Sequence, residues 1–161
     1  EAFDDQILKN MNKALTTKQV IDGIEATLAE GISPGFNIIF GNLGDNRKTL
    51  RKSIELLDKY NDFGQLRVIR PVTPYPGTPL YYHAIEEGLL SGPDDFYEKH
   101  KNIELLTCNF TDIPDDEFHE LLFETNKKII KDYYKHLEKT TVETFRNAYF
   151  GHDYSFRGAR H

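Results

Sequence analysis

The sequence predicts an α/β domain built on a parallel β-sheet, and three observations support this prediction. Two short apolar runs, residues 36–40 and 66–70, have the composition of buried strands. Each run follows a segment whose apolar residues recur with helical spacing. Short loops rich in glycine or polar residues join these segments. Helix–strand–helix–strand order with short connections is typical of repeated βα units, whose strands are parallel.

The helices of the first half have clear start and stop signals. Asp4 or Asp5 is expected to cap a short N-terminal helix. Thr16 and Gln19 have the spacing of a capping box, which predicts that a second helix begins there. Gly31 stands in the position where a glycine commonly ends a helix.

The second half continues with three further helices. Asn46 is expected to cap a helix that ends near residue 60. Thr78 is expected to cap a helix over residues 79–87, with a proline at the first helical position. Pro114 is expected to begin the longest helix, which reaches about residue 139.

Three segments of the second half have a less regular pattern. Residues 91–102 are polar and irregular. Residues 103–110 are apolar and predict either a strand or a packed loop. The segment from Thr140 onward is rich in aromatic side chains, which predicts that it packs on another surface.

Length and composition limit the classes of protein. The chain has 161 residues, which fits one domain of about 150 residues. Its 26 acidic and 20 basic side chains give a net charge of −6, which argues against nonspecific nucleic-acid binding. No run of about 18 apolar residues is present, so we expect no membrane span. The low cysteine content favours a reducing compartment, so we expect a cytoplasmic protein. The single cysteine, Cys108, excludes an internal disulfide and a metal site made of cysteines alone.

The two loops that directly follow the predicted strands are the candidate binding elements. Residues 40–45 contain two glycines, which let a backbone approach a ligand closely; an ordinary tight turn is the alternative. Residues 73–81 contain three prolines and a glycine, which predicts a rigid wall of a site; a rigid surface turn is the alternative. Loops at the carboxyl ends of parallel strands are where barrel and open-sheet enzymes bind their ligands.

These loops, with the start of the chain, resemble the C-terminal half of a radical S-adenosylmethionine (SAM) iron–sulfur enzyme. The subgroup is the one associated with B12-binding domains. Residues 73–81 read Thr-Pro-Tyr-Pro-Gly-Thr-Pro-Leu-Tyr, a string frequent in that family. Residues 37–45 resemble its Gly-x-Ile-x-Gly-x-x-Gly-Glu strand motif, with asparagine for the first glycine and aspartate for the glutamate. Glu1 and Ala2 stand where the family has Glu-Ser, and Leu8, Met11 and Lys13 fit its following helix.

The resemblance implies a fold and a division of the chain. Residues 1–90 would be the later βα units of a partial (β/α) barrel, and residues 91–161 a helical C-terminal extension. The whole enzyme would use a [4Fe–4S] cluster and SAM, and cobalamin where it transfers methyl groups. The cluster-binding cysteine triplet is absent, and Cys108 lies on the wrong side of the chain for it. We therefore expect the isolated chain to be inactive and to bind no cofactor tightly, with the missing N-terminal half of the barrel as its partner.

The resemblance also implies a set of ligand-contacting residues, none of which is catalytic or metal-binding. Glu1 would lie near the ribose or the amino-acid part of SAM. Ile39 and Gly41 would lie beside the adenine. Arg67 and Arg70 would reach the SAM carboxylate or an anionic substrate; ion pairs at the surface or between strands are the alternative. The remaining residues line the proline-rich loop near the substrate: Pro74, Tyr75, Gly77 and Thr78.

Two other functions are compatible with the sequence. Half a barrel leaves a sheet edge unpaired, which favours an accessory domain that assembles as a homodimer through that edge. The glycine loop at residues 41–45, at a helix start, suits a phosphate group in a small βα enzyme. Dimerisation that does not depend on SAM favours the first alternative, and phosphate binding favours the second.

Overall fold

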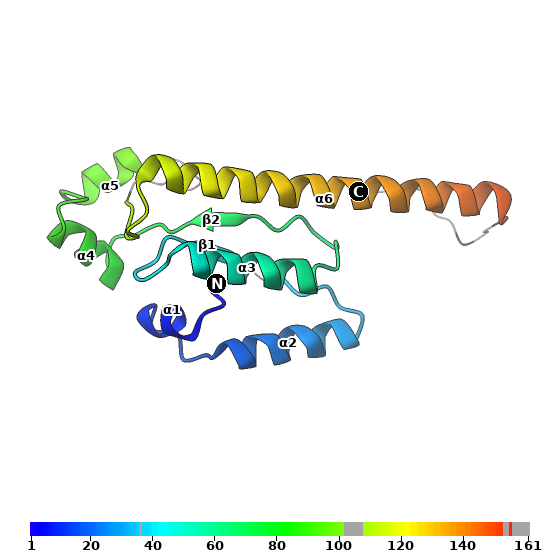
Figure 1. Cartoon of the computed structure of the whole chain (residues 1–161), viewed down its shortest axis with the longest axis horizontal. Helices are drawn as coiled ribbons and strands as arrows, with labels where there is room; N and C mark the ends of the chain where they lie inside the picture. Colours follow the sequence, from blue (N-terminus) through cyan, green and yellow to red (C-terminus); the bar gives the residue numbers. More distant parts are fainter. Residues whose placement is uncertain (36, 102–107, 153–154, 156–161) are drawn as a thin grey trace.

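The computed structural model describes residues 1–35, 37–101, 108–152 and 155. Within these ranges the chain forms six helices and two strands, and helices predominate (Figure 1). The elements follow one another in this order: α1 (Asp5–Asn10), α2 (Thr17–Ala29), β1 (Ile38–Phe40), α3 (Arg47–Tyr60), β2 (Ile69–Pro71), α4 (Pro79–Glu86), α5 (Pro93–Lys99) and α6 (Asp115–Phe150).

The two strands form a parallel pair, as predicted, but β2 begins three residues later than the predicted run at residues 66–70 and includes Pro71. Ile38 lies opposite Ile69, and Phe40 lies opposite Pro71. Helix α3 makes the crossover between the strands, and α6 runs along β2 (Figure 1). Buried side chains from the strands, the helices around them and two loops form one hydrophobic core. Its members are Phe3, Ile24, Ile38, Phe40, Leu50, Leu57, Tyr60, Ile69, Ile113, Phe118, Leu122 and Ile129.

The expected partial (β/α) barrel is wrong. Over the described residues the sheet ends after two three-residue strands, and no series of βα units is present. The physical reason lies at the outer edge of β2. The side chain of Asn126 on α6 accepts a hydrogen bond from the Ile69 N–H (2.9 Å) and donates one to the Ile69 carbonyl (2.8 Å). This amide takes the place of a neighbouring strand, and Pro71 has no N–H with which to extend the pairing.

The helix starts follow the predicted caps. The Asp4 carboxylate accepts from the first-turn N–H groups of α1. Thr16 and Gln19 form the expected capping box at α2. Asn46 caps α3, and Thr78 caps α4 ahead of the proline at its first position. These four predictions are confirmed because each cap depends on residues two or three positions apart.

Two helical segments differ from the sequence-based expectation. The polar segment after residue 91 contains α5, which begins with a proline and has Asp94 and Asp95 in its first turn. Acidic residues in the first turn are stabilised by the positive end of the helix dipole, and proline is common at the first helical position. The sequence therefore contained a signal for the start of α5. Helix α6 does not stop near residue 139 but continues to Phe150. The apolar run at 103–110 lies mostly outside the described residues.

The first half of α6 packs in the same core as the strands. Phe118 stacks on Phe40 with their ring centroids 5.0 Å apart. A second, smaller cluster joins α4 to α5 through Tyr81, Leu90 and Phe96. The division of the chain at residue 90 stays a prediction. In the described ranges no helix combines the length and apolar character needed to cross a bilayer.

Candidate functional site

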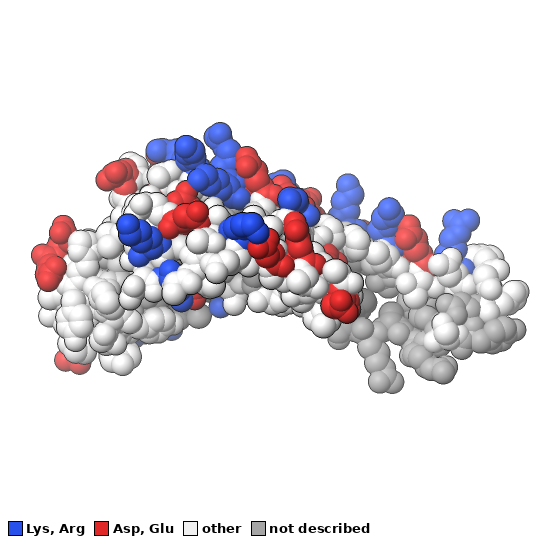
Figure 2. Space-filling model, turned by 90° about the horizontal axis from the view of Figure 1, so that it is seen from below, with Lys and Arg blue, Asp and Glu red and all other residues white. Residues whose placement is uncertain are grey.

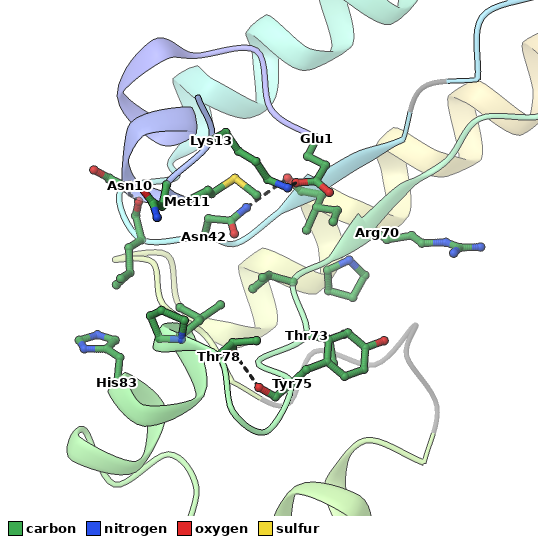
Figure 3. Close-up of a pocket in the computed structure, with 17 residues that line it drawn as sticks. Glu1, Asn10, Met11, Lys13, Asn42, Arg70, Thr73, Tyr75, Thr78 and His83 are labelled. Atoms are coloured by element: carbon green, nitrogen blue, oxygen red, sulfur yellow. Dashed lines mark hydrogen bonds and ion pairs between the residues drawn. The ribbon is translucent and has the colours of Figure 1, made fainter. Parts of the chain in front are cut away.

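A cavity of about 650 Å³ opens at the carboxyl ends of β1 and β2 (Figure 3). Its volume is in the range of sites that hold cofactors and small substrates. Apolar and amide side chains make up most of its wall. The lining residues are Glu1, Asn10, Met11, Asn12, Lys13, Ile39, Asn42, Leu43, Arg70, Pro71, Val72, Thr73, Tyr75, Thr78, Pro79, Leu80 and His83.

The loop after β1 forms one wall, and a buried carboxylate holds its shape. Asp45 is 6% exposed, and its Oδ2 accepts from the backbone N–H groups of Gly41 (3.0 Å) and Asn42 (2.9 Å). The Thr49 hydroxyl donates to Oδ1 at 2.7 Å. Burial raises the pKa of the Asp45 carboxyl, against the effect of these hydrogen bonds, which lower it. The turn places Asn42 and Leu43 in the cavity wall.

Two independent features of the structure favour a glycine at position 41. Its φ of +101° lies in the left-handed region, which side chains disfavour. A Cβ built on Gly41 would come within 3.1 Å of the Phe118 ring. The glycine therefore allows the strand to turn sharply while α6 packs directly against its backbone.

The start of the chain and α1 form the adjoining wall. The Ile39 N–H donates to the Glu1 carbonyl at 2.9 Å, so the first residue lies alongside β1. The Lys13 ammonium and the Glu1 carboxylate form an ion pair at 2.7 Å at the cavity rim (Figure 3). The Asn10 amide donates to the Leu43 carbonyl at 2.8 Å and ties α1 to the loop after β1. This wall presents one positive and one negative group side by side.

The proline-rich loop after β2 forms the opposite wall. The Val72 N–H donates to the Phe40 carbonyl at 2.9 Å, which extends the contact between the strands to the base of the loop. The Thr78 hydroxyl donates to the Tyr75 carbonyl at 2.7 Å and closes the turn (Figure 3). The same hydroxyl oxygen accepts from the Tyr81 N–H at the start of α4. Thr78 thus sets the direction in which α4 leaves the cavity.

The structure brings five of the sequence-predicted site residues to this cavity. They are Glu1, Ile39, Arg70, Tyr75 and Thr78. The Arg70 guanidinium points away from the other labelled side chains in Figure 3.

Four predicted residues do not line the cavity. Gly41 packs under Phe118, and the Pro74 side chain, within the proline-rich loop, is fully buried. Gly77 has a φ of +89° and serves the turn. Arg67 precedes β2 and lies away from the cavity, at the opposite end of the strand from the proline-rich loop.

The partners of Arg67 are those of a structural residue. The guanidinium is buried and forms an ion pair with Asp62 at 2.7 Å. It also donates to the Pro34 carbonyl at 2.8 Å and to the Ser33 hydroxyl at 3.0 Å. These contacts join the segment before β2 to the segment before β1.

Several lining residues were not singled out from the sequence. Met11 and Lys13 belonged to the family-like helix pattern, and Asn42 and Leu43 lay within the glycine loop, so the signal was present. His83 had no such signal, and it lines the cavity from α4, a helix outside both motif loops. Within the described residues no group of three histidine, cysteine or acidic side chains is placed to hold a metal ion.

The comparisons with known proteins give one partial similarity. The chain is 30% identical over 91 residues to an uncharacterized methyltransferase of Pyrococcus horikoshii. The aligned segment is 56% of this chain and 19% of the relative, so the chain spans about a fifth of that protein's length. No family model matches the chain, and no solved structure does. About half of this chain is therefore similar in sequence to one part of a protein named as a methyltransferase.

Proposed function

We propose that this chain supplies walls of the SAM- and substrate-binding site of a methyltransferase of the radical SAM iron–sulfur class. The observation that carries the proposal is the convergence of two separate motifs on one cavity. Ile39, Asn42 and Leu43 come from the glycine loop, and Tyr75 and Thr78 come from the proline-rich loop. The printed name of the Pyrococcus horikoshii relative supports the methyl-transfer part of the proposal.

The chemistry of the cavity suits the parts of SAM. Ile39, Met11 and Leu43 offer an apolar surface on which an adenine ring gains contact area. The amino-acid part of SAM carries one ammonium and one carboxylate. Glu1 and Lys13 form an ion pair at the rim and match these charges with opposite ones.

The residues of this chain do not fit an iron–sulfur cluster. Three thiolates hold such a cluster, and this chain has Cys108 alone, which is buried. In the proposal the cluster ligands, and cobalamin where the reaction uses it, belong to the N-terminal half of a longer enzyme. This chain binds and orients its ligands, and it is inactive by itself.

A titration monitored by amide NMR tests the proposal. The method detects weak binding, which is expected because this chain supplies only part of the binding site. S-adenosylhomocysteine is added to the isotope-labelled chain at millimolar concentrations. We expect the amide signals of Ile39, Asn42, Leu43 and Thr73 to shift in a saturable way. A lack of saturable shifts at these positions would contradict the proposal.

A pair of matched variants ties the binding to the cavity. Leu80→Glu places a carboxylate in the cavity wall, and Leu66→Glu makes the same change outside it. We expect Leu80→Glu to abolish the shifts and Leu66→Glu to preserve them. Equal effects of the two changes would show that the ligand binds elsewhere.

A further inference from the structure

Asn42 is the polar side chain that the cavity wall buries most deeply. It is 4% exposed, whereas the other described polar residues that line the cavity are partly buried or exposed. It follows the glycine after β1 and lines the cavity from that loop (Figure 3). A buried amide carries two N–H donors and one acceptor oxygen, and each of these groups needs a hydrogen-bond partner. The partners of these groups therefore decide what this part of the wall can bind.

The surroundings of Asn42 fix which way its amide faces. Nδ2 donates to the Ile39 carbonyl and to Asp45 Oδ2, both at 3.4 Å. Each of these neighbours is an oxygen that accepts hydrogen bonds, and Asp45 Oδ2 also accepts from the Gly41 N–H. The opposite orientation of the amide would set Oδ1 against both oxygens, which is unfavourable. The amide therefore keeps Nδ2 toward the loop and Oδ1 away from it.

The side-chain oxygen of Asn42 is left as an open acceptor. Within the part of the chain that the structure describes, Oδ1 accepts no hydrogen bond. It is not enclosed by protein atoms either, since Asn42 lines the cavity and this oxygen is accessible from it. The wall thus presents one hydrogen-bond acceptor of fixed orientation to the molecule that occupies the cavity.

Neighbouring polar groups of the wall already have partners in the protein. The Asn10 amide uses both of its ends, since Nδ2 donates to the Leu43 carbonyl and Oδ1 accepts from Gln6 Nε2, each at 2.8 Å. Lys13 and Glu1 pair with each other at 2.7 Å. The open amide oxygen after β1 is therefore distinct from these groups, whose closest partners belong to the chain itself.

The loop around Asn42 does not suit a phosphate group. The backbone N–H groups of Gly41 and Asn42, which a phosphate would need, both donate to Asp45 Oδ2. The buried carboxylate and the open amide oxygen both repel an anion. On the face that Figure 2 shows, Lys and Arg side chains are interspersed with Asp and Glu, so no broad positive field attracts an anion there. The open acceptor therefore suits an uncharged or cationic group that carries a donor.

The geometry points to Asn42 as a specificity-determining residue that accepts a hydrogen bond from the 6-amino group of adenine. This inference rests on the proposed function, in which Ile39, Met11 and Leu43 hold the adenine ring. Leu43 is the next residue along the loop and Ile39 ends three positions earlier in β1, so a ring on their side chains brings its edge to Oδ1. The amino group is the hydrogen-bond donor on the edge of this ring. An oxo group at the same position would set two acceptor oxygens against each other.

Two ligands that differ at this position test the inference on the wild-type chain. S-adenosylhomocysteine carries the 6-amino group, and S-inosylhomocysteine carries an oxo group in its place. Amide NMR titrations give the two dissociation constants. We expect the inosine ligand to bind about tenfold or more weakly, because it loses the hydrogen bond and leaves Oδ1 unpaired. Equal affinities would overturn the inference alone, whereas saturable shifts with neither ligand would contradict the proposed function as well.

Matched asparagine variants assign the preference to one oxygen. Asn42→Ala removes the open acceptor, and Asn10→Ala removes an amide of the same cavity whose two ends are engaged within the chain. We expect Asn42→Ala to reduce the ratio of the two dissociation constants to about two or less, and Asn10→Ala to leave the ratio as in the wild type. A preference that survives Asn42→Ala would belong to another group and overturn the inference. Circular dichroism checks that both variants stay folded, and the comparison of the two ligands on the wild type depends on neither variant.

Discussion

Replacement of Asp45 by alanine tests the claim that this carboxylate holds the cavity loop. Asp45 Oδ2 accepts from two backbone N–H groups, those of Gly41 and Asn42, and both residues are buried. Without the carboxylate these donors lose their partner in a place that excludes water. The Thr49 hydroxyl is less affected, because it also donates to the Asn46 carbonyl at 2.9 Å.

The size of the effect follows from these contacts. A buried donor left without an acceptor costs about 1–3 kcal/mol, and Asp45→Ala leaves two. Removal of a desolvated carboxylate offsets part of this cost, since burial raises its pKa. We expect a net loss of about 2–4 kcal/mol in the free energy of unfolding. For a chain of this length that corresponds to a fall in Tm of about 5–15 °C.

Thermal and urea unfolding followed by circular dichroism measures this loss. Asp45→Asn is the informative companion variant, because its remaining oxygen can accept both N–H groups while its amide faces Thr49. It should cost less than about 1 kcal/mol. Asp58→Ala removes a carboxylate from an exposed ion pair with Lys128 and should cost about 0–1 kcal/mol. If Asp45→Ala were no worse than Asp58→Ala, the loop would not depend on the buried carboxylate.

The remaining predictions concern the loop after β1 and the edge of β2 that Asn126 covers. Gly41→Ala should lower the free energy of unfolding by about 1–3 kcal/mol, because its Cβ meets the Phe118 ring and its φ is positive; urea unfolding measures this. Asn126→Ala should cost about 1–3 kcal/mol and raise hydrogen exchange at the Ile69 amide, whose acceptor is lost. The pKa of Asp45 is raised in the folded chain, so its contribution to stability is fully present below the unfolded value of about 3.8 and is lost as pH rises through the folded pKa. The stability of the wild type relative to Asp45→Asn should therefore fall as pH rises above about 4, and a constant difference across that range would contradict the assigned shift.

Two control substitutions separate these effects from general ones. Gly23→Ala changes a glycine inside α2 where a Cβ meets nothing within 4 Å, and it should stabilise the chain by about 0.5–1 kcal/mol. Asn147→Ala removes an exposed asparagine from the same helix as Asn126, and it should change stability by no more than about 0.5 kcal/mol. Destabilisation by either control as large as that of its partner variant would refute the assigned mechanism.

Part of the candidate site could be predicted from the sequence, because two of its walls are loops that directly follow the predicted strands. The expected parallel pairing of two strands, which the structure has between Ile38–Phe40 and Ile69–Pro71, was enough to predict that the next loops meet at one edge. His83 lines the cavity because of where α4 lies, and Arg67 does not line it because its guanidinium binds Asp62 and Pro34 in the segments that precede the two strands. Neither of these follows from local spacing.

By itself, the sequence determined the local structure: the caps at Asp4, Thr16, Asn46 and Thr78, and the strand–turn–helix order around the two motif loops. These features depend on neighbours within a few positions, whose interactions are the same in any fold. Only the tertiary structure decided that the sheet ends at β2. That outcome depends on the Asn126 amide, which reaches Ile69 from 57 positions away and satisfies the edge that a third strand would have used. Sequence periodicity cannot predict a hydrogen bond between two residues that only the packing of distant elements brings together.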